Sequence, residues 1–235
     1  GVTLQNLTIK GDLLIAQAVG DGEVTLKNVV VRGKTQVSGG GANSVVVIDS
    51  TLRTVEVDKE GVTLRAQGTT VIDLVNLKAG ARVEEDGVEG DGVKDVNVDP
   101  GLPEGTTIVL KGNFNSVQVN SGSITLELED GQVIELVTGD DARDLNIVLD
   151  SGSSVGTLTL NAPVSVSGTG AIGEAVINVA GCTIEQKPTE VTVAPGVTAV
   201  VDGKTVGLPT GGGGGGPVTP PTEITVTGVA ISGEA

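Results

Sequence analysis

The stretch GVTLQNLTIKGDLLIAQAVGDGEVTLKNVVVRG, residues 1–33, contains one short motif twice. The sequence VTLQN at residues 2–6 returns as VTLKN at residues 24–28, which is 22 residues further along the chain. In both copies apolar and polar side chains alternate, which is the pattern of a β-strand with one buried face. A motif that recurs at a period of about 20 residues indicates a repeat protein, in which each turn of the chain stacks on the previous one.

Variants of this motif continue along the chain as VVVID at residues 45–49, VTLRA at residues 62–66 and ITLEL at residues 124–128. Between them lie further short runs of Val, Ile, Leu and Thr, and Gly, Asn, Asp or Ser ends each run. No long segment has a helical period. Residues 1–208 are therefore predicted to form a right-handed parallel β-helix of roughly ten coils, about 50 Å long at about 4.8 Å per coil.

The motif also predicts where its side chains lie. Alternation places Val2 and Leu4 in the core, while Asn6 and Asn28 fall at equivalent corners, where their amides can form a hydrogen-bonded ladder. An antiparallel β-sandwich would also contain many short strands. It would not explain the near-copy at 22 residues or a core almost without aromatic rings, so the β-helix is the favoured fold.

The composition excludes several classes of function. The chain has 235 residues, a formal net charge of −16, no His, one Cys (Cys182) and one aromatic residue (Phe114). It therefore cannot form a His-activated nucleophile, an imidazole metal site, a disulfide framework or a Cys-based zinc site. With 14 Lys and Arg against 30 Asp and Glu, binding to nucleic acid or to anionic lipid is not expected. We expect a non-enzymatic protein with no cofactor, in which Cys182 is a small core residue and Phe114 a lone core ring or an end plug.

Acidic clusters are the remaining candidates for a site, because polysaccharide lyases that have this fold hold Ca²⁺ between carboxylates. The candidates are Glu84, Glu85 and Asp86 with Glu89 and Asp91, and then Asp140, Asp141 and Asp144. Neither cluster has the spacing of a known calcium loop. We interpret both as solvated acidic loops, with weak Ca²⁺ binding at the second cluster as the alternative. A calcium-dependent polysaccharide lyase or binder is the least favoured function.

The end of the sequence differs from the rest. Residues 209–222 contain a run of glycines followed by prolines and are predicted to form a linker. Residues 223–235 alternate as a further strand, with an apolar stripe made by Ile224, Val226, Val229 and Ile231. A single strand cannot bury such a stripe by itself, so it needs a partner.

Two stretches resemble the β-helix segments of large secreted surface proteins of Gram-positive spore-forming and thermophilic bacteria, which occur beside S-layer homology modules or bacterial Ig-like repeats. They run from Gly1 to about Asn43 and from Ser167 to Val206, and the resemblance covers most of residues 1–206. The matching text is residues 1–33, quoted above, and GTGAIGEAVINVAGCTIEQKPTEVTVAPGVTAVVDGKTV at residues 168–206. The tail ITVTGVAISGEA at residues 224–235 is similar to the opening strand of an Ig-like repeat. The resemblance implies an extracellular structural or adhesive role and supplies no catalytic residues.

These observations lead to two hypotheses for a cell-surface protein. In the first, copies of the chain assemble head to tail into a filament or layer, and the tail strand of one copy adds to the open first strand, at Val2 and Leu4, of the next. In the second, the chain is a monomeric stalk or adhesin segment of a larger protein. The chain starts on Gly1 without Met and has no apolar stretch long enough to span a membrane, so we expect a trimmed piece of a secreted protein, attached to the cell wall through flanking modules.

Overall fold

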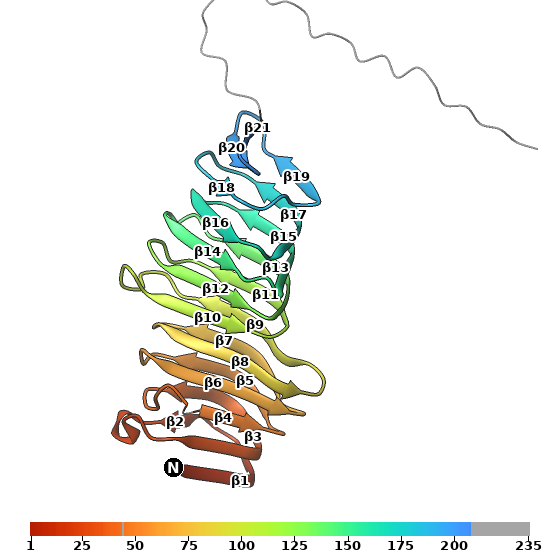
Figure 1. The fold of residues 1–235 in the computed structure, drawn as a ribbon. Coiled ribbons are helices and arrows are strands. Elements are labelled where there is room, and N and C mark those ends of the chain that lie inside the picture. Colours follow the sequence, from red (N-terminus) through yellow and green to blue (C-terminus); the bar gives the residue numbers. More distant parts are fainter. Residues whose placement is uncertain (44, 208–235) are drawn as a thin grey trace, which may run out of the picture.

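A computed structural model describes residues 1–43 and 45–207, which form one parallel β-solenoid of about 10 turns. The coils stack along a single axis from β1 at one end to β21 at the other (Figure 1). The predicted linker at residues 209–222 and the predicted terminal strand, with Ile224, Val226, Val229 and Ile231, lie outside the described residues. The parallel β-helix predicted from the 22-residue repeat is confirmed over the described part of the chain.

The described residues contain short strands and a single 3₁₀ turn. In chain order these elements are β1 (Val2–Ile9), β2 (Leu13–Ile15), η1 (Gln17–Val19), β3 (Val24–Val37), β4 (Val45–Ile48), β5 (Thr51–Val57), β6 (Val62–Gly68), β7 (Val71–Leu77), β8 (Ala81–Val88), β9 (Gly92–Val98), β10 (Thr107–Lys111), β11 (Phe114–Val119), β12 (Thr125–Glu129), β13 (Gly131–Thr138), β14 (Leu145–Leu149), β15 (Ser153–Leu160), β16 (Val164–Gly168), β17 (Ala171–Ile177), β18 (Thr183–Ile184), β19 (Glu190–Val193), β20 (Thr198–Val201) and β21 (Lys204–Gly207).

The strands form two parallel stacks that enclose the core. Strands β4, β6, β8 and every second strand up to β20 form one stack, while β5, β7, β9 and every second strand up to β19 form the other. The long strand β3 takes part in both stacks. In the first coils Val2 pairs with Val24 and Leu4 with Leu26, so the two copies of the sequence motif lie directly on one another.

The core is a continuous column of aliphatic side chains. One row runs through Ile108, Leu126, Ile147, Val166 and Ile184, which are paired from coil to coil and buried. Rows of this kind bury branched side chains of equal size without a large ring, as the composition suggested. Phe114 is 2% exposed in β11 and is a core residue in the middle of the stack, so the alternative of an end plug is wrong.

The first coil departs from the predicted burial. Val24 and Leu26 are buried, whereas Val2 is 54% exposed and Leu4 is only half-buried. This difference arises although Val2 pairs with Val24 and Leu4 pairs with Leu26. The prediction that Val2 and Leu4 lie in the core is therefore wrong for Val2 and only partly right for Leu4. The reason is that β1 pairs with β3 on one edge and has no second coil beside it in the described part of the chain.

A corner within β1 and β3, and at the end of β4 and β6, requires a left-handed backbone. Asn6 and Asn28 have φ angles of 55° and 52°, and Asp49 and Gly68 take the same corner in the next coils with φ angles of 50° and 60°. Asn, Asp and Gly are the residues that tolerate this conformation. Nδ2 of Asn28 donates to Oδ1 of Asn6 at 2.8 Å, so the predicted ladder between these two residues is confirmed.

The other end of the solenoid closes in a way that the repeat did not predict. Strand β21 turns back and pairs antiparallel with β20, with Val201 opposite Lys204 and Thr198 opposite Gly207. The turn between them contains Asp202 and Gly203, both of positive φ, which suits a tight hairpin. The outer edge of β20 is thereby paired, whereas β19 beside it pairs only with β17 in the described residues.

Candidate functional sites on the solenoid surface

A ladder of alternating charges crosses the outer face of the stack that contains β6, β8 and β12. The carboxylate of Glu84 accepts hydrogen bonds from Nε of Arg65 and, at 2.6 Å, from Nε of Arg82. The same Arg82 donates to Glu129 at 2.6 Å. Burial by itself would raise the pKa of Glu84, but the hydrogen bonds from Arg82 and Arg65 outweigh it and leave the pKa lowered. The acidic run that begins at Glu84 is therefore not simply a solvated loop, because its first carboxylate links successive coils.

This ladder predicts a pH-dependent contribution to stability. Because the pKa of Glu84 is lowered in the folded chain, its contribution is present above the ordinary Glu pKa and is lost as the pH falls through the folded value. Glu84→Gln should cost about 1–2 kcal/mol of unfolding free energy at neutral pH, since the side chain is only 12% exposed. The difference from the unmodified chain should shrink below about pH 4.

Urea unfolding followed by circular dichroism at several pH values would measure this difference. Glu127→Gln on the neighbouring β12 is a matched control, because Glu127 makes no ion pair among the described residues. An equal loss for Glu84→Gln at acid and neutral pH would contradict the assigned role of the ion pairs.

Glu85 lies at a corner where the register between β6 and β8 shifts. Ala66 pairs with Glu85 but Gly68 pairs with Val88, so extra residues are inserted at this corner. One oxygen of Glu85 accepts the backbone N–H of Val93 and the other accepts that of Asn113, each at 2.8 Å. Burial raises the pKa of Glu85, and these two hydrogen bonds oppose the rise. The acidic-loop interpretation is therefore wrong for Glu85, although Asp86, Glu89 and Asp91 are exposed.

A groove of about 460 Å³ lies beside these hydrogen bonds. It is lined by Gly90 and Asp91 of the segment before β9, by Asn113 just before β11, and by residues of β9, β11 and β13. The side chains that line it are those of Asp91, Lys94, Asn113, Phe114, Asn115, Gln132 and Ile134. The groove cannot be predicted from the sequence because its residues come from three coils of unequal length. The only available signal was the exposed apolar position Ile134 within an alternating strand.

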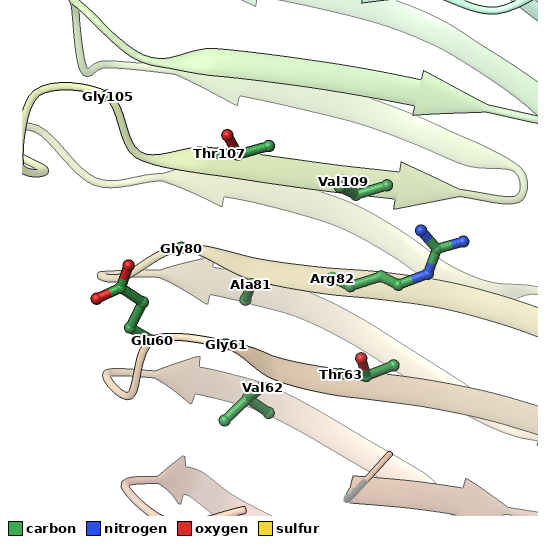
Figure 2. A pocket seen from close by; sticks show the side chains of 10 residues that line it. All are labelled: Glu60, Gly61, Val62, Thr63, Gly80, Ala81, Arg82, Gly105, Thr107 and Val109. Carbon is green, nitrogen blue, oxygen red and sulfur yellow. The ribbon is translucent and has the colours of Figure 1, made fainter. Parts of the chain in front are cut away.

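A second hollow, of about 340 Å³, lies over β6, β8 and β10 (Figure 2). It forms because β10 pairs with β8 only from Val109 onward, so the preceding parts of the two coils separate. Glu60 and Arg82 lie at opposite ends of it (Figure 2), and Arg82 is already bonded to Glu84 and Glu129. The hollow therefore holds no adjacent acid and base of the kind that a polysaccharide lyase needs.

The second acidic cluster lies in the loop between β13 and β14. Asp140, Asp141 and Asp144 are all exposed there, and Asp144 has a positive φ of 58°. Within residues 1–43 and 45–207, no group of three or more His, Cys, Asp or Glu side chains comes together in a way that could hold a metal ion. The three aspartates are thus near in sequence but do not converge on one point.

Two further sequence expectations concern single features. Cys182 is buried in the core, where burial raises the pKa of its thiol, as expected for a packing residue. Among the described residues, no helix is long and apolar enough to cross a membrane.

The fold places this protein in the class of parallel β-solenoids with a continuous aliphatic core. No protein family matches the chain, and no curated protein matches it. Among solved structures, the chain is similar to part of the chitinase ChiW from Paenibacillus sp. str. FPU-7, described as a bacterial cell-surface-expressed multi-modular enzyme machinery. The identity is 30% and the TM-score 0.63, over 74% of this chain and 16% of that one. The chain therefore spans about a sixth of that larger protein.

Proposed function

We propose that this chain is a structural solenoid module of a bacterial cell-surface protein. The observation that carries the proposal is the similarity, at 30% identity over 74% of the chain, to a segment of a cell-surface-expressed protein built from many modules. A stack of aliphatic layers closed by ladders of hydrogen bonds suits a rigid spacer outside the cell, because each coil is held by both of its neighbours.

The proposed role is non-enzymatic. The chain has no His, and the best-buried surface carboxylates, Glu84 and Glu85, are bonded to arginines and to backbone N–H groups. The larger protein is a chitinase, but this chain matches only 16% of it. We therefore do not assign chitinase activity to the described residues.

Within this structural role we propose head-to-tail assembly, because the first coil of the described chain has an unpaired strand edge. Strand β1 offers one edge without a partner among the described residues, and it carries the exposed apolar side chains Val2 and Leu7. The occupant that we propose for this edge is the segment at residues 223–235 of a second copy, for which the sequence predicts a strand whose apolar side chains Ile224, Val226, Val229 and Ile231 would cover Val2 and Leu7. A contact of this kind does not close on itself and gives a filament.

Electron microscopy tests the role and the assembly separately. Immunogold labelling of intact cells that produce the protein should mark their outer surface, and label found only in lysed cells would contradict the surface role. The purified chain should form filaments, while the chain truncated after residue 208 should form single rods about 50 Å long. Single rods from both chains would rule out assembly and leave the monomeric stalk.

A further inference from the structure

We propose that the groove between residues 86–91 and strands β9, β11 and β13 binds a neutral oligosaccharide. The groove has a volume of about 460 Å³ and combines exposed amide side chains with one exposed apolar side chain. This site does not depend on the proposed surface role, because it rests only on the side chains that line the groove.

The polar lining consists mainly of amides that have unused hydrogen-bonding groups. Oδ1 of Asn113 accepts the backbone N–H of Gln132 at 3.1 Å, which fixes the Asn113 side chain and leaves its Nδ2 directed elsewhere. The side chains of Asn115 and Gln132 make no hydrogen bond within the described residues. Each amide carries a donor and an acceptor, which matches a sugar hydroxyl because that group also both donates and accepts.

The lining has one positive and one negative side chain, Lys94 and Asp91, and these two form an ion pair. Nζ of Lys94 lies 3.5 Å from Asp91 and 3.1 Å from Asp73, so its positive charge is already paired. A charged ligand would have to compete with these pairs, whereas an uncharged one would leave them intact. This arrangement favours a neutral sugar over a uronate or a phosphate.

Ile134 provides the apolar surface of the groove. Its side chain is 56% exposed, although the flanking residue Val133 is buried. The equivalent corner of the next coil is Gly156, so no neighbouring side chain covers Ile134 from that direction. The C–H face of a pyranose ring can pack against such a side chain, which replaces the aromatic platform that this chain lacks.

A peptide is a poorer candidate for the groove. Strands β9, β11 and β13 are each paired on both edges, so they offer no free backbone edge to which an extended peptide could add. The groups available to a ligand are side chains alone. The clamp of Glu85 on Val93 and Asn113 also holds β9 and β11 in a fixed relation, so the amides are already positioned before a ligand arrives.

NMR titration of the ¹⁵N-labelled chain tests this proposal. The probes are hexasaccharides of β-1,4-linked glucose, of β-1,4-linked N-acetylglucosamine and of α-1,4-linked glucose. At least one of them should shift the side-chain NH₂ signals of Asn113, Asn115 and Gln132, with a Kd of about 1 mM because the groove offers a few hydrogen bonds and one apolar side chain. The double variant Asn115→Ala/Gln132→Ala should weaken this binding roughly tenfold.

Asn146→Ala is the matched control, because Asn146 is an amide residue of β14 in the other stack and lies outside the groove. It should leave the Kd unchanged. The proposal is overturned if none of the three hexasaccharides shifts these signals, or if the double variant binds as tightly as the unmodified chain. It is also overturned if oligogalacturonate or a Gly-Ser hexapeptide shifts them more strongly than every neutral sugar does.

Discussion

Gly131→Ala is expected to lower the free energy of unfolding by about 4 kcal/mol. Gly131 opens β13 with a φ of 140°, a conformation that alanine adopts only with strain. A Cβ atom placed there would lie 2.0 Å from the carbonyl oxygen of Gly112 in the adjacent coil. The same oxygen accepts the N–H of Gln132 at 3.1 Å, so the two coils would have to separate, at the expense of their ladder, to admit a methyl group.

Gly101→Ala provides the control for this substitution. Gly101 also has a positive φ, 79°, but no atom lies within 4 Å of a Cβ atom placed there. It should therefore show only the backbone cost of about 1–2 kcal/mol. Urea unfolding followed by far-ultraviolet circular dichroism would measure both variants, and equal losses would mean that the approach of Gly131 to Gly112 does not limit the stacking.

The sequence was sufficient to predict the fold because residues one repeat apart lie on one another in adjacent coils. Val24 and Leu26 lie on Val2 and Leu4 in the structure, and Asn28 bonds to Asn6, as the spacing of 22 residues implies. These features depend only on residues at equivalent positions of adjacent coils. The exposure of Val2 depends instead on what lies beyond the first coil, and no local pattern contains that information.

The features that were missed arise where the coils change length. Glu85 binds the backbone of Val93 and of Asn113, which are 8 and 28 residues away, and backbone N–H groups leave no trace in the sequence. The hairpin that β21 forms on β20 turns at Asp202-Gly203, but the same pair also stands at residues 130–131, where it joins two strands of the parallel stacks. Alternation therefore predicts strands well but does not predict which strand pairs with which.

The candidate groove could not be predicted from the sequence either, because it also depends on coils of unequal length. Asn115 and Ile134 occupy one corner of two adjacent coils, and they are 19 positions apart, whereas the motif near the start of the chain repeats after 22. Gly90 and Asp91 of the segment at residues 86–91 lie beside them, and Glu85, just before this segment, accepts the N–H of Val93, just after it. The irregular coils thus provide the groove, while the regular coils provide the rigid support.

Leu126→Ala is expected to cost about 3–4 kcal/mol of unfolding free energy and to reduce the cooperativity of unfolding. Leu126 is fully buried in the middle of the stack, paired with Ile108 on one side and Ile147 on the other. In a solenoid each coil is stabilised only by its neighbours, so a cavity here weakens the contacts through which the two halves of the rod are coupled. The halves should then unfold in separate steps, which a broadened urea transition would show.

Leu14→Ala is the matched control, because Leu14 is 60% exposed in β2. It should change the unfolding free energy by less than about 0.5 kcal/mol and leave the transition sharp. Limited proteolysis of Leu126→Ala at intermediate urea should release one half of the solenoid intact. A large loss of stability with an unchanged, single sharp transition would contradict this prediction. It would show that the coils unfold together along the whole rod and are coupled beyond their nearest neighbours.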